Sequence, residues 1–230
     1  LEGLENLRLG LGLRKPQRKI ISLSKNPLED SNILGELFTA ISQKLTITLY
    51  YHTFKAKEAR LSVNLYPYLL KEYNRRWFLI AAAESDGKLL TFSLDRIDDV
   101  KPLSSHKYAE YEGDINEIYE DIIGITYKEE SPVYKILFWV SNMSADYVAT
   151  KPLHESQRNI GSAHETELRS QFPQLIEGRF FLIECKENYE LIRELTSFGK
   201  DLVVLSPSPI TGMVEKRISD MNEIYSDLRK

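Results

Sequence analysis

The stretch NLYPYLLKEYNRRWFLIAAAESDGKLLTFSLDRIDDV, residues 64–100, decides the fold of the first half of this chain. Residues 77–83 and 89–94 within it are short aromatic and aliphatic runs, which are typical of buried strands. Asp86 and Gly87 lie between the two runs, and glycine takes the positive φ that tight hairpin turns need. The sequence therefore predicts an antiparallel hairpin.

Three arginines flank this hairpin, because Arg75 and Arg76 precede it and Arg96 follows it. The outer ends of antiparallel strands lie together, so we expect the three guanidinium groups to converge on one rim. Arginine pairs with phosphate and stacks on rings, and such a rim favours a planar anionic ligand such as a nucleotide. The rings that could supply stacking are Tyr51, His52, Tyr68 and Tyr73.

A structural role stays open for each of these residues. An aromatic side chain is more often part of a core than of a binding surface. Arg96 has acidic neighbours in Asp95 and Asp98, so a plain surface ion pair is the alternative to ligand binding. Trp77, Phe78 and Leu79 are expected to be structural core, with Trp77 and Leu79 on one face of their strand and Phe78 on the other.

The same stretch resembles a WYL domain. The resemblance rests on PYLLKEYNRRWFLI at residues 67–80 and FSLDRI at residues 92–97, with Phe78 in the place of the tyrosine that gives the family its name. Three further strings resemble the C-terminal extension that follows WYL domains in bacterial regulators. They are GIT at 124–126, KPLHESQ at 151–157 and LIRELTSFGKDLVVLSP at 191–207.

The resemblance implies an α+β chain, with a small Sm- or SH3-like β-barrel followed by a second domain. It implies an N-terminal linker segment at 1–29, a WYL domain at 30–104, an acidic connector at 105–130 and the extension domain at 131–230. WYL domains are thought to bind nucleic-acid-derived ligands through basic positions, which Arg76 and Arg96 match. Family members usually carry a DNA-binding winged helix in front, and residues 1–29 are too short to hold one.

Periodicity agrees with this division. Residues 45–51 and 61–65 alternate as half-buried strands, and Pro67 is expected to stop the second strand or to place it on an edge. A helix before them is expected to bury Ile33, Leu34, Leu37, Phe38 and Ile41.

The second half of the chain, from residue 133 on, predicts the order β-α-β-β-α-β, which is the ferredoxin-like arrangement. The two middle strands of this order are expected at 165–172 and 179–186. Asn188 is expected to cap the helix that follows them. A last helix, with apolar residues from Met213 to Leu228, runs past the compact unit.

Composition argues against catalysis and against metal or membrane sites. The four histidines are far apart without metal-ligand spacing, and no phosphate-binding glycine motif or nucleophile elbow occurs. The single Cys185 excludes an internal disulfide and lies in an apolar run, which favours an inert core thiol in a cytoplasmic protein. No apolar run is long enough to span a membrane. We therefore expect neither an enzyme, nor a cofactor, nor a metal.

Charge is segregated along the chain, although the net charge is only −4. Residues 51–76 hold six Lys or Arg against two acids, whereas residues 110–130 hold eight acids against one base. Opposite patches of this kind favour pairing between two copies, so we expect a homodimer. The sequence predicts the ligand-sensing and dimerisation region of a bacterial transcriptional regulator, which binds a nucleotide or single-stranded nucleic acid. The alternative is an interaction module that binds no small ligand.

Overall fold

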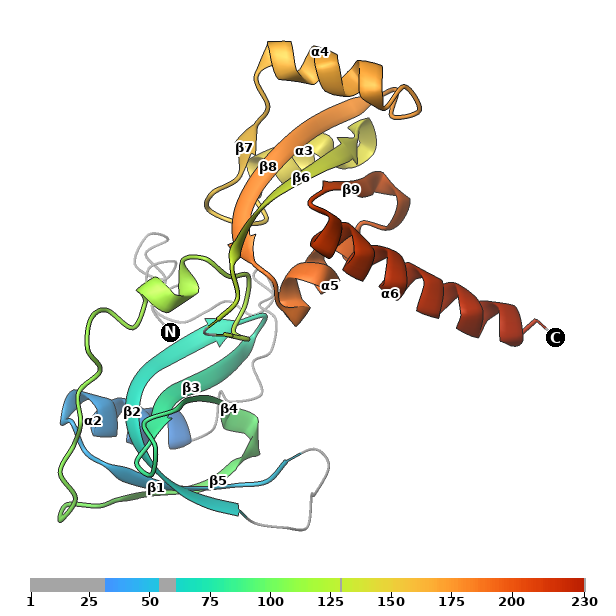
Figure 1. Ribbon diagram of the computed structural model, residues 1–230. Helices are drawn as coiled ribbons and strands as arrows, with labels where there is room; N and C mark the ends of the chain where they lie inside the picture. The colour runs from blue at the N-terminus through green and yellow to red at the C-terminus, as the bar shows by residue number, and fades with distance from the viewer. Residues whose placement is uncertain (1–31, 54–60, 129, 230) are drawn as a thin grey trace, which may run out of the picture.

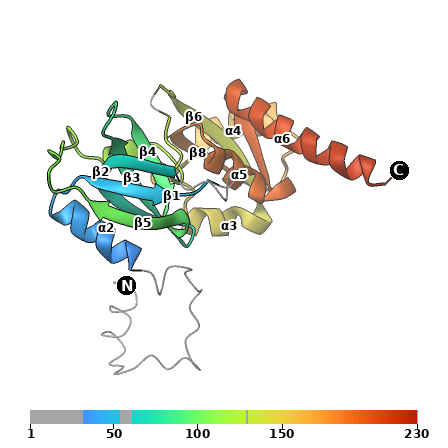
Figure 2. The ribbon, with the colours of Figure 1, turned by 90° about the horizontal axis from the view of Figure 1, so that it is seen from below.

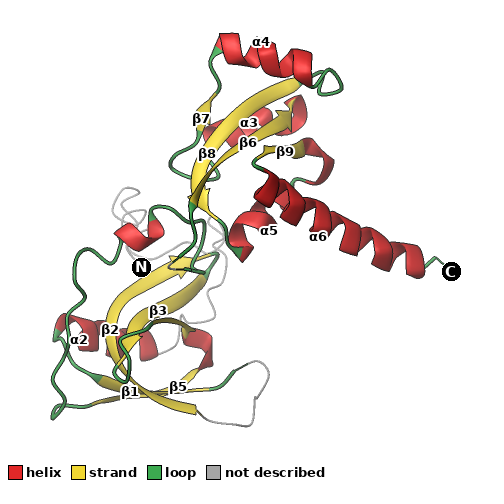
Figure 3. Ribbon diagram, in the orientation of Figure 1, coloured by secondary structure: helices red, strands yellow, loops and turns green. Residues whose placement is uncertain are grey.

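The computed structural model of the chain describes residues 32–53, 61–128 and 130–229. They form two antiparallel β-sheets with α-helices packed on them, so the α+β class is confirmed. Figure 1 shows the sheets in two lobes, joined by the connector between β5 and β6. Helix α6 projects away from the second lobe (Figure 3). The predicted linker at 1–29 lies outside the described residues.

The first sheet has the strand order β4-β3-β2-β1-β5. Its first four strands form a meander, and β5 returns to pair with β1. Helix α2 (Ile33–Ser42) packs against β2 and β5, as Figure 2 shows from below. The strands are β1 (Ile47–Tyr51), β2 (Leu61–Tyr73), β3 (Arg76–Ala83), β4 (Leu89–Ser93) and β5 (Ile97–Pro102), with the short 3₁₀ helix η1 (Leu94–Arg96) before β5.

Alternating apolar residues build the core of this lobe. Ile47, Leu49, Leu65 and Leu79 are fully buried on the inner face of the sheet, and Leu37 of α2 is buried against them. Side chains that alternate along a strand share one face, so the period of two in the sequence places these residues together.

The predicted apolar face of α2 is wrong at one position. Phe38 is 64% exposed, whereas Ala40 is buried in the core. Leu37 and Ala40 are three residues apart and share one face of the helix, while adjacent positions lie about 100° apart around its axis. The buried stripe therefore passes through Ala40 and leaves the aromatic ring outside.

Pro67 does not stop β2. The strand continues to Tyr73, with a shift of register between Pro67 and Leu69 in its pairing with β3. A bulge of this kind is where a strand accommodates proline. Strand β1 pairs with β2 only as far as Leu65, so among the described strands β3 alone pairs with β2 beyond that residue. Pro67 therefore lies on an edge of the sheet, which is the second of the two expectations for this residue.

Two tight turns, not one, shape the sheet. Gly87 has φ +71° and its N–H donates to the carbonyl of Ala83 at 2.8 Å, as the Asp86-Gly87 signal predicts. A further turn joins β2 to β3, where Asn74 and Arg75 have φ of 52° and 66°. Both values suit a hairpin turn with two left-handed residues. The turn contains no glycine, so its sequence carries only a weak turn signal.

The second sheet has the strand order β7-β8-β6-β9, again antiparallel throughout. Its predicted order of elements holds except in the middle. The elements are β6 (Val133–Ser141), α3 (Asn142–Thr150), β7 (Arg158–Asn159), α4 (Ser162–Gln171), β8 (Gly178–Lys186), α5 (Tyr189–Ser197), the 3₁₀ helix η3 (Gly199–Asp201), β9 (Leu202–Ser206) and α6 (Ser208–Asp227).

The strand predicted at 165–172 is wrong, because residues 165–171 belong to α4 and Phe172 caps that helix. Leu168 is the only residue of that helix that is buried, so a period of two had few apolar residues to support it. Glu165 and Arg169, four residues apart, pair at 2.6 Å on the helix surface. The strand that occupies the edge of the sheet is the two-residue β7, which is too short to show a periodic pattern.

Both faces of the second sheet are covered. Phe138 and Phe181 stack with ring centroids 5.7 Å apart on the face that α3 and α5 cover, and Trp139 and Phe180 face α4 on the other. Cys185 is fully buried in the first of these layers. Burial raises the pKa of its thiol to about 12, which suits the expected core role.

The connector is fixed to the N-terminus of α5. The side chain of Asn188 accepts from the N–H of Leu191 at 2.7 Å, so the predicted cap is confirmed, and its amide donates to the carbonyl of Ile123 at 2.8 Å. Gly124 has φ +87°, and a Cβ there would lie 2.5 Å from Cγ of Glu190. Glycine is required at this place for both reasons.

Gly124→Ala is expected to lower the free energy of unfolding by about 2–4 kcal/mol. Alanine is strained at a left-handed φ, and its Cβ would also overlap the side chain of Glu190. Urea denaturation of the variant and the parent measures the difference. Gly161→Ala is the matched control, because a Cβ at Gly161 meets nothing within 4 Å. A stability equal to that of the parent would show that the connector does not hold α5 in this way.

Candidate effector-binding site

A pocket of about 260 Å³ opens on the first lobe where β1, β4 and η1 come together. Aromatic, hydroxyl and guanidinium groups share its wall, which is the mixture that a base and a phosphate need. Its lining residues are Tyr51, Thr53, Leu90, Thr91, Phe92, Ser93 and Arg96.

Tyr51 and Phe92 form the aromatic side of the pocket. Their rings meet edge to face, with centroids 5.0 Å apart and an angle of 73°. The register of β1 against β5 shifts between Tyr50 and Tyr51, so the end of β1 departs from regular pairing where Tyr51 enters the pocket. Bulges of this kind often re-aim a side chain next to a binding site.

Arg96 ends the 3₁₀ turn that joins β4 to β5, and its half-buried side chain lines the same pocket as Tyr51. The backbone ties this turn to β1, because the N–H of His52 donates to the carbonyl of Arg96 at 3.2 Å. The imidazole Nδ1 of His52 lies 3.3 Å from a carboxylate oxygen of Asp98. Tyr51, His52 and Arg96 are therefore brought together.

Arg76 lies near this turn but pairs with an acid. Its guanidinium is 3.8 Å from Asp95, whose carboxylate also accepts from the hydroxyl of Ser93 in the pocket wall. Arg75 lies at the exposed β2–β3 turn, and its N–H donates to Glu72 at 2.5 Å. Neither Arg75 nor Arg76 lines the pocket. The sequence did not predict a site role for Phe92 or for the hydroxyl residues of the wall, because nothing in their spacing distinguishes them. These hydroxyl residues are Thr53, Thr91 and Ser93.

Tyr68 lies in a different cluster. Its hydroxyl donates to the carbonyl of Ala109 at 3.0 Å, and the hydroxyl of Tyr108 donates to the carbonyl of Pro67 at 2.7 Å. Burial raises the pKa of Tyr108 to about 12, and burial also raises the pKa of Tyr68. These two reciprocal bonds fasten the connector along β2 beyond its pairing with β1.

The three residues placed in the core differ in burial. Leu79 is fully buried, Trp77 is half-buried against the same cluster, and Phe78 lies outside that cluster. Ile80, which shares the face of Phe78, packs instead with Tyr119 of the connector. Trp77 and Leu79 thus share one face, as the alternation predicts.

No group of three or more His, Cys, Asp or Glu side chains able to hold a metal ion occurs in the described ranges. Within the same residues, no helix is long and apolar enough to cross a membrane.

Comparison with known proteins finds one family match, which lies in the first lobe. Residues 32–102 match the model of the WYL domain. No curated protein matches the chain.

Two solved structures resemble the chain distantly. Proteasome accessory factor B/C (PafBC) of Arthrobacter aurescens has 14% identity and a TM-score of 0.35, over 82% of this chain and 26% of that one. A CRISPR Cas-related protein has 17% identity and a TM-score of 0.47, over 87% of this chain and 54% of that one. The chain thus spans about a quarter of the first and about half of the second.

Trp77→Ala is expected to cost about 1–3 kcal/mol of stability, less than the roughly 2–5 kcal/mol expected for Leu79→Ala, because its ring is only half-buried. Urea unfolding of both variants measures the order. A Trp77→Ala variant that unfolds like the parent but no longer binds a nucleotide or single strand would make the ring a stacking platform and not core.

Proposed function

Because this chain contains a WYL domain at residues 32–102, we propose that it is the effector-sensing part of a bacterial transcriptional regulator. The observation that carries the proposal is the pocket that Arg96 lines together with the aromatic pair Tyr51 and Phe92. The function is binding without catalysis. Contact with DNA through a separate DNA-binding domain is part of this proposal.

The effector of this proposal is a nucleotide or a single-stranded nucleic acid. Phosphates would pair with Arg96 and Arg76, and one base would lie against Tyr51. A pocket of about 260 Å³ suits one base with its sugar rather than a long strand, so a strand would leave most of its length outside. Arg75, His52 and Tyr68 lie outside the pocket wall, and only an extended ligand would reach them.

Finer fold assignments belong to the same proposal. A helix followed by five strands, with β5 returning to β1, suits an Sm- or SH3-like barrel. The second lobe is ferredoxin-like in this proposal, with α4 inserted between its two middle strands. Its support is the antiparallel order β9-β6-β8-β7, which places the fourth, first, third and second strands side by side.

Pairing of two copies through α6 would carry the signal. Val214, Ile218, Met221, Tyr225 and Leu228 recur at intervals of four and three residues, which is the spacing of a coiled-coil seam. The last four of these side chains are exposed. Effector binding would then shift the population of paired arrangements and so move the attached DNA-binding domains.

The exposed seam of α6 also favours the second candidate, an interaction module that needs no ligand. The two candidates differ in one respect. A sensor must bind its effector with an affinity that falls as salt rises, because phosphate contacts release counterions. An interaction module pairs equally well with and without nucleotides.

Arg96→Ala is expected to weaken binding of a short labelled single strand by roughly 10–150-fold, which corresponds to the loss of one charge-assisted hydrogen bond of about 1.5–3 kcal/mol. Arg76→Ala is expected to act in the same direction with a smaller effect, because it lies outside the pocket wall. Fluorescence anisotropy at several salt concentrations measures both.

Arg179→Ala is the matched control. Arg179 is as exposed as Arg76, with side-chain fractions of 49% and 50%, and it also holds an ion pair, but it belongs to the second lobe. The Arg179→Ala variant should bind the labelled single strand with the affinity of the parent. Unchanged affinity in both Arg76→Ala and Arg96→Ala, with normal melting curves, would remove the site assignment.

The chain is expected to sediment as a dimer, above the 26.6 kDa of one copy. Ile218→Asp with Met221→Asp should shift it to a monomer without unfolding, because both side chains are exposed in the single chain. Asn222→Asp, an exposed residue of the same helix outside the seam, is the control. A parent that stays monomeric at every concentration would contradict the pairing.

A further inference from the structure

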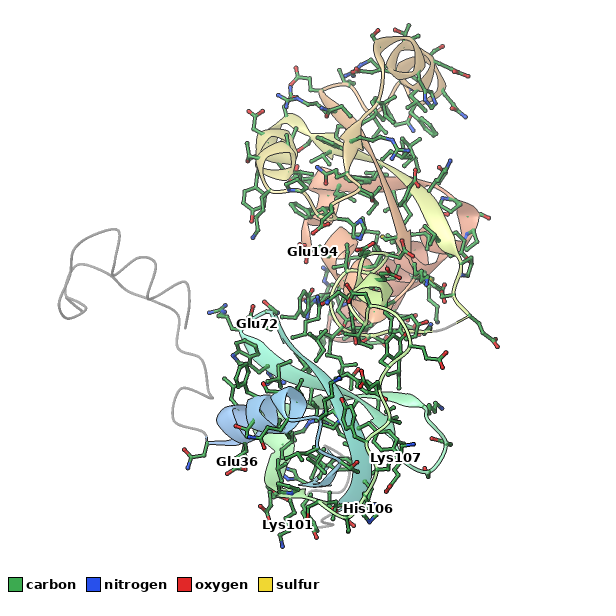
Figure 4. All side chains as sticks on the ribbon, turned by 90° about the vertical axis from the view of Figure 1, so that its left-hand side faces the viewer. Glu36, Glu72, Lys101, His106, Lys107 and Glu194 are labelled. Carbon is green, nitrogen blue, oxygen red and sulfur yellow. The ribbon has the colours of Figure 1, made fainter. Side chains whose placement is uncertain are left out.

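A second and larger cleft, of about 620 Å³, lies where the two lobes meet. The end of β2, the connector and the loop after α3 each supply part of its wall. Figure 4 shows Glu72 of β2 and Glu194 of α5 on opposite sides of this junction. The guanidinium of Arg193 crosses the junction to donate to the hydroxyl of Tyr73 at 3.0 Å.

The cleft contains an open strand edge. Among the described residues, β1 pairs with β2 only over Leu61–Leu65, and no strand pairs with residues 66–73 on the side away from β3. Pro67 and the adjacent bulge protect the first part of this edge, which is a common defence against strand addition. The last part, Lys71 to Tyr73, lies beyond the bulge and lines the cleft.

The walls beside this edge differ in chemistry. Tyr119, Ile122 and Leu153 give an apolar floor, whereas exposed carboxylates form the rim. Among the described residues that line the cleft, Lys71 is the only lysine or arginine, and its ammonium sits 4.9 Å from the centre of the ring of Tyr119. The carboxylates of the rim are Glu72, Glu120 and Glu155.

We propose that this cleft binds an extended basic peptide, which adds as a strand to the free edge of β2. Main-chain groups of the peptide would pair with the open groups of β2, as in other cases of strand addition. Successive side chains of a strand point to opposite sides, so apolar residues would enter the floor while lysine or arginine residues meet the rim. Charge complementarity selects a basic partner over nucleic acid, because three carboxylates outnumber one ammonium.

The proposal does not rest on the effector site, which lies on other elements and favours an anion. A peptide in the cleft would touch β2, the connector and the loop after α3 together, and would brace one lobe against the other. Arg193 and Tyr73 already hold this junction on one side.

The test uses the full chain and a fluorescein-labelled seven-residue peptide of alternating lysine and valine. Fluorescence anisotropy should show saturable binding, and hydrogen exchange at residues 69–73 should slow in its presence. Glu120→Lys with Glu155→Lys should weaken binding by about tenfold or more, because each exposed charge pair is worth up to about 1 kcal/mol. Glu167→Lys with Glu223→Lys, which alters exposed acids outside the cleft, should leave binding unchanged.

A peptide methylated on every second amide nitrogen separates strand addition from plain charge attraction, since it keeps its charge but cannot pair along one edge. It should not bind measurably. Saturable binding that survives methylation, or that is equal in the Glu120/Glu155 variant and the parent, would overturn the proposal. Absence of saturable binding by the unmethylated peptide would overturn it as well.

Discussion

The packing of Glu190 over Gly124 is the constraint on which the arrangement of the two lobes depends. Glu190 is 7% exposed, one of its oxygens accepts from the hydroxyl of Thr126 at 2.9 Å, and its methylene lies where any other residue at 124 would carry a Cβ. With the Asn188 cap, this contact binds the connector to α5. The position of α5 in turn lets Arg193 reach Tyr73, so the cleft owes its shape to a turn that only glycine can form.

The connector is a structural element of both lobes, although it contains little regular structure. In the first lobe, tyrosine hydroxyls attach it to β2, and an ion pair between Lys44 and Glu110 at 2.6 Å attaches it to the turn after α2. His106 also binds Glu84 at 2.7 Å, a hydrogen bond that lowers the pKa of that carboxyl (Figure 4 labels His106). In the second lobe, the carbonyl of Asp121 accepts from the N–H of Lys186 at the C-terminal end of β8. Glu110 of the connector thus serves attachment within one chain, and attraction between copies is a separate proposal.

The candidate site shows why a list of residue types is an incomplete guide to a pocket. Arg96 and Tyr51 share the pocket because β5 returns to pair with β1, and this pairing joins residues distant in the sequence. Arg75 is as basic as Arg96 but lies at a turn outside the wall, and Tyr68 fastens the connector. Identical chemistry therefore has different roles, which depend on the register of strands and the path of the connector.

Local patterns in the sequence determined the α+β class, the hairpin around Gly87, the Asn188 cap and the shared face of Trp77 and Leu79 on β3. These features depend on periods of two residues and on turn preferences, which neighbouring residues settle among themselves. Tertiary structure decided the rest. Residues 165–171 became helical where only Leu168 needed burial, β2 continued through Pro67 because β1 does not pair with it there, and β7 took an edge with two residues. The pocket and the cleft also belong to this second group, since long-range pairing and the Gly124 contact create them, and no local pattern encodes either.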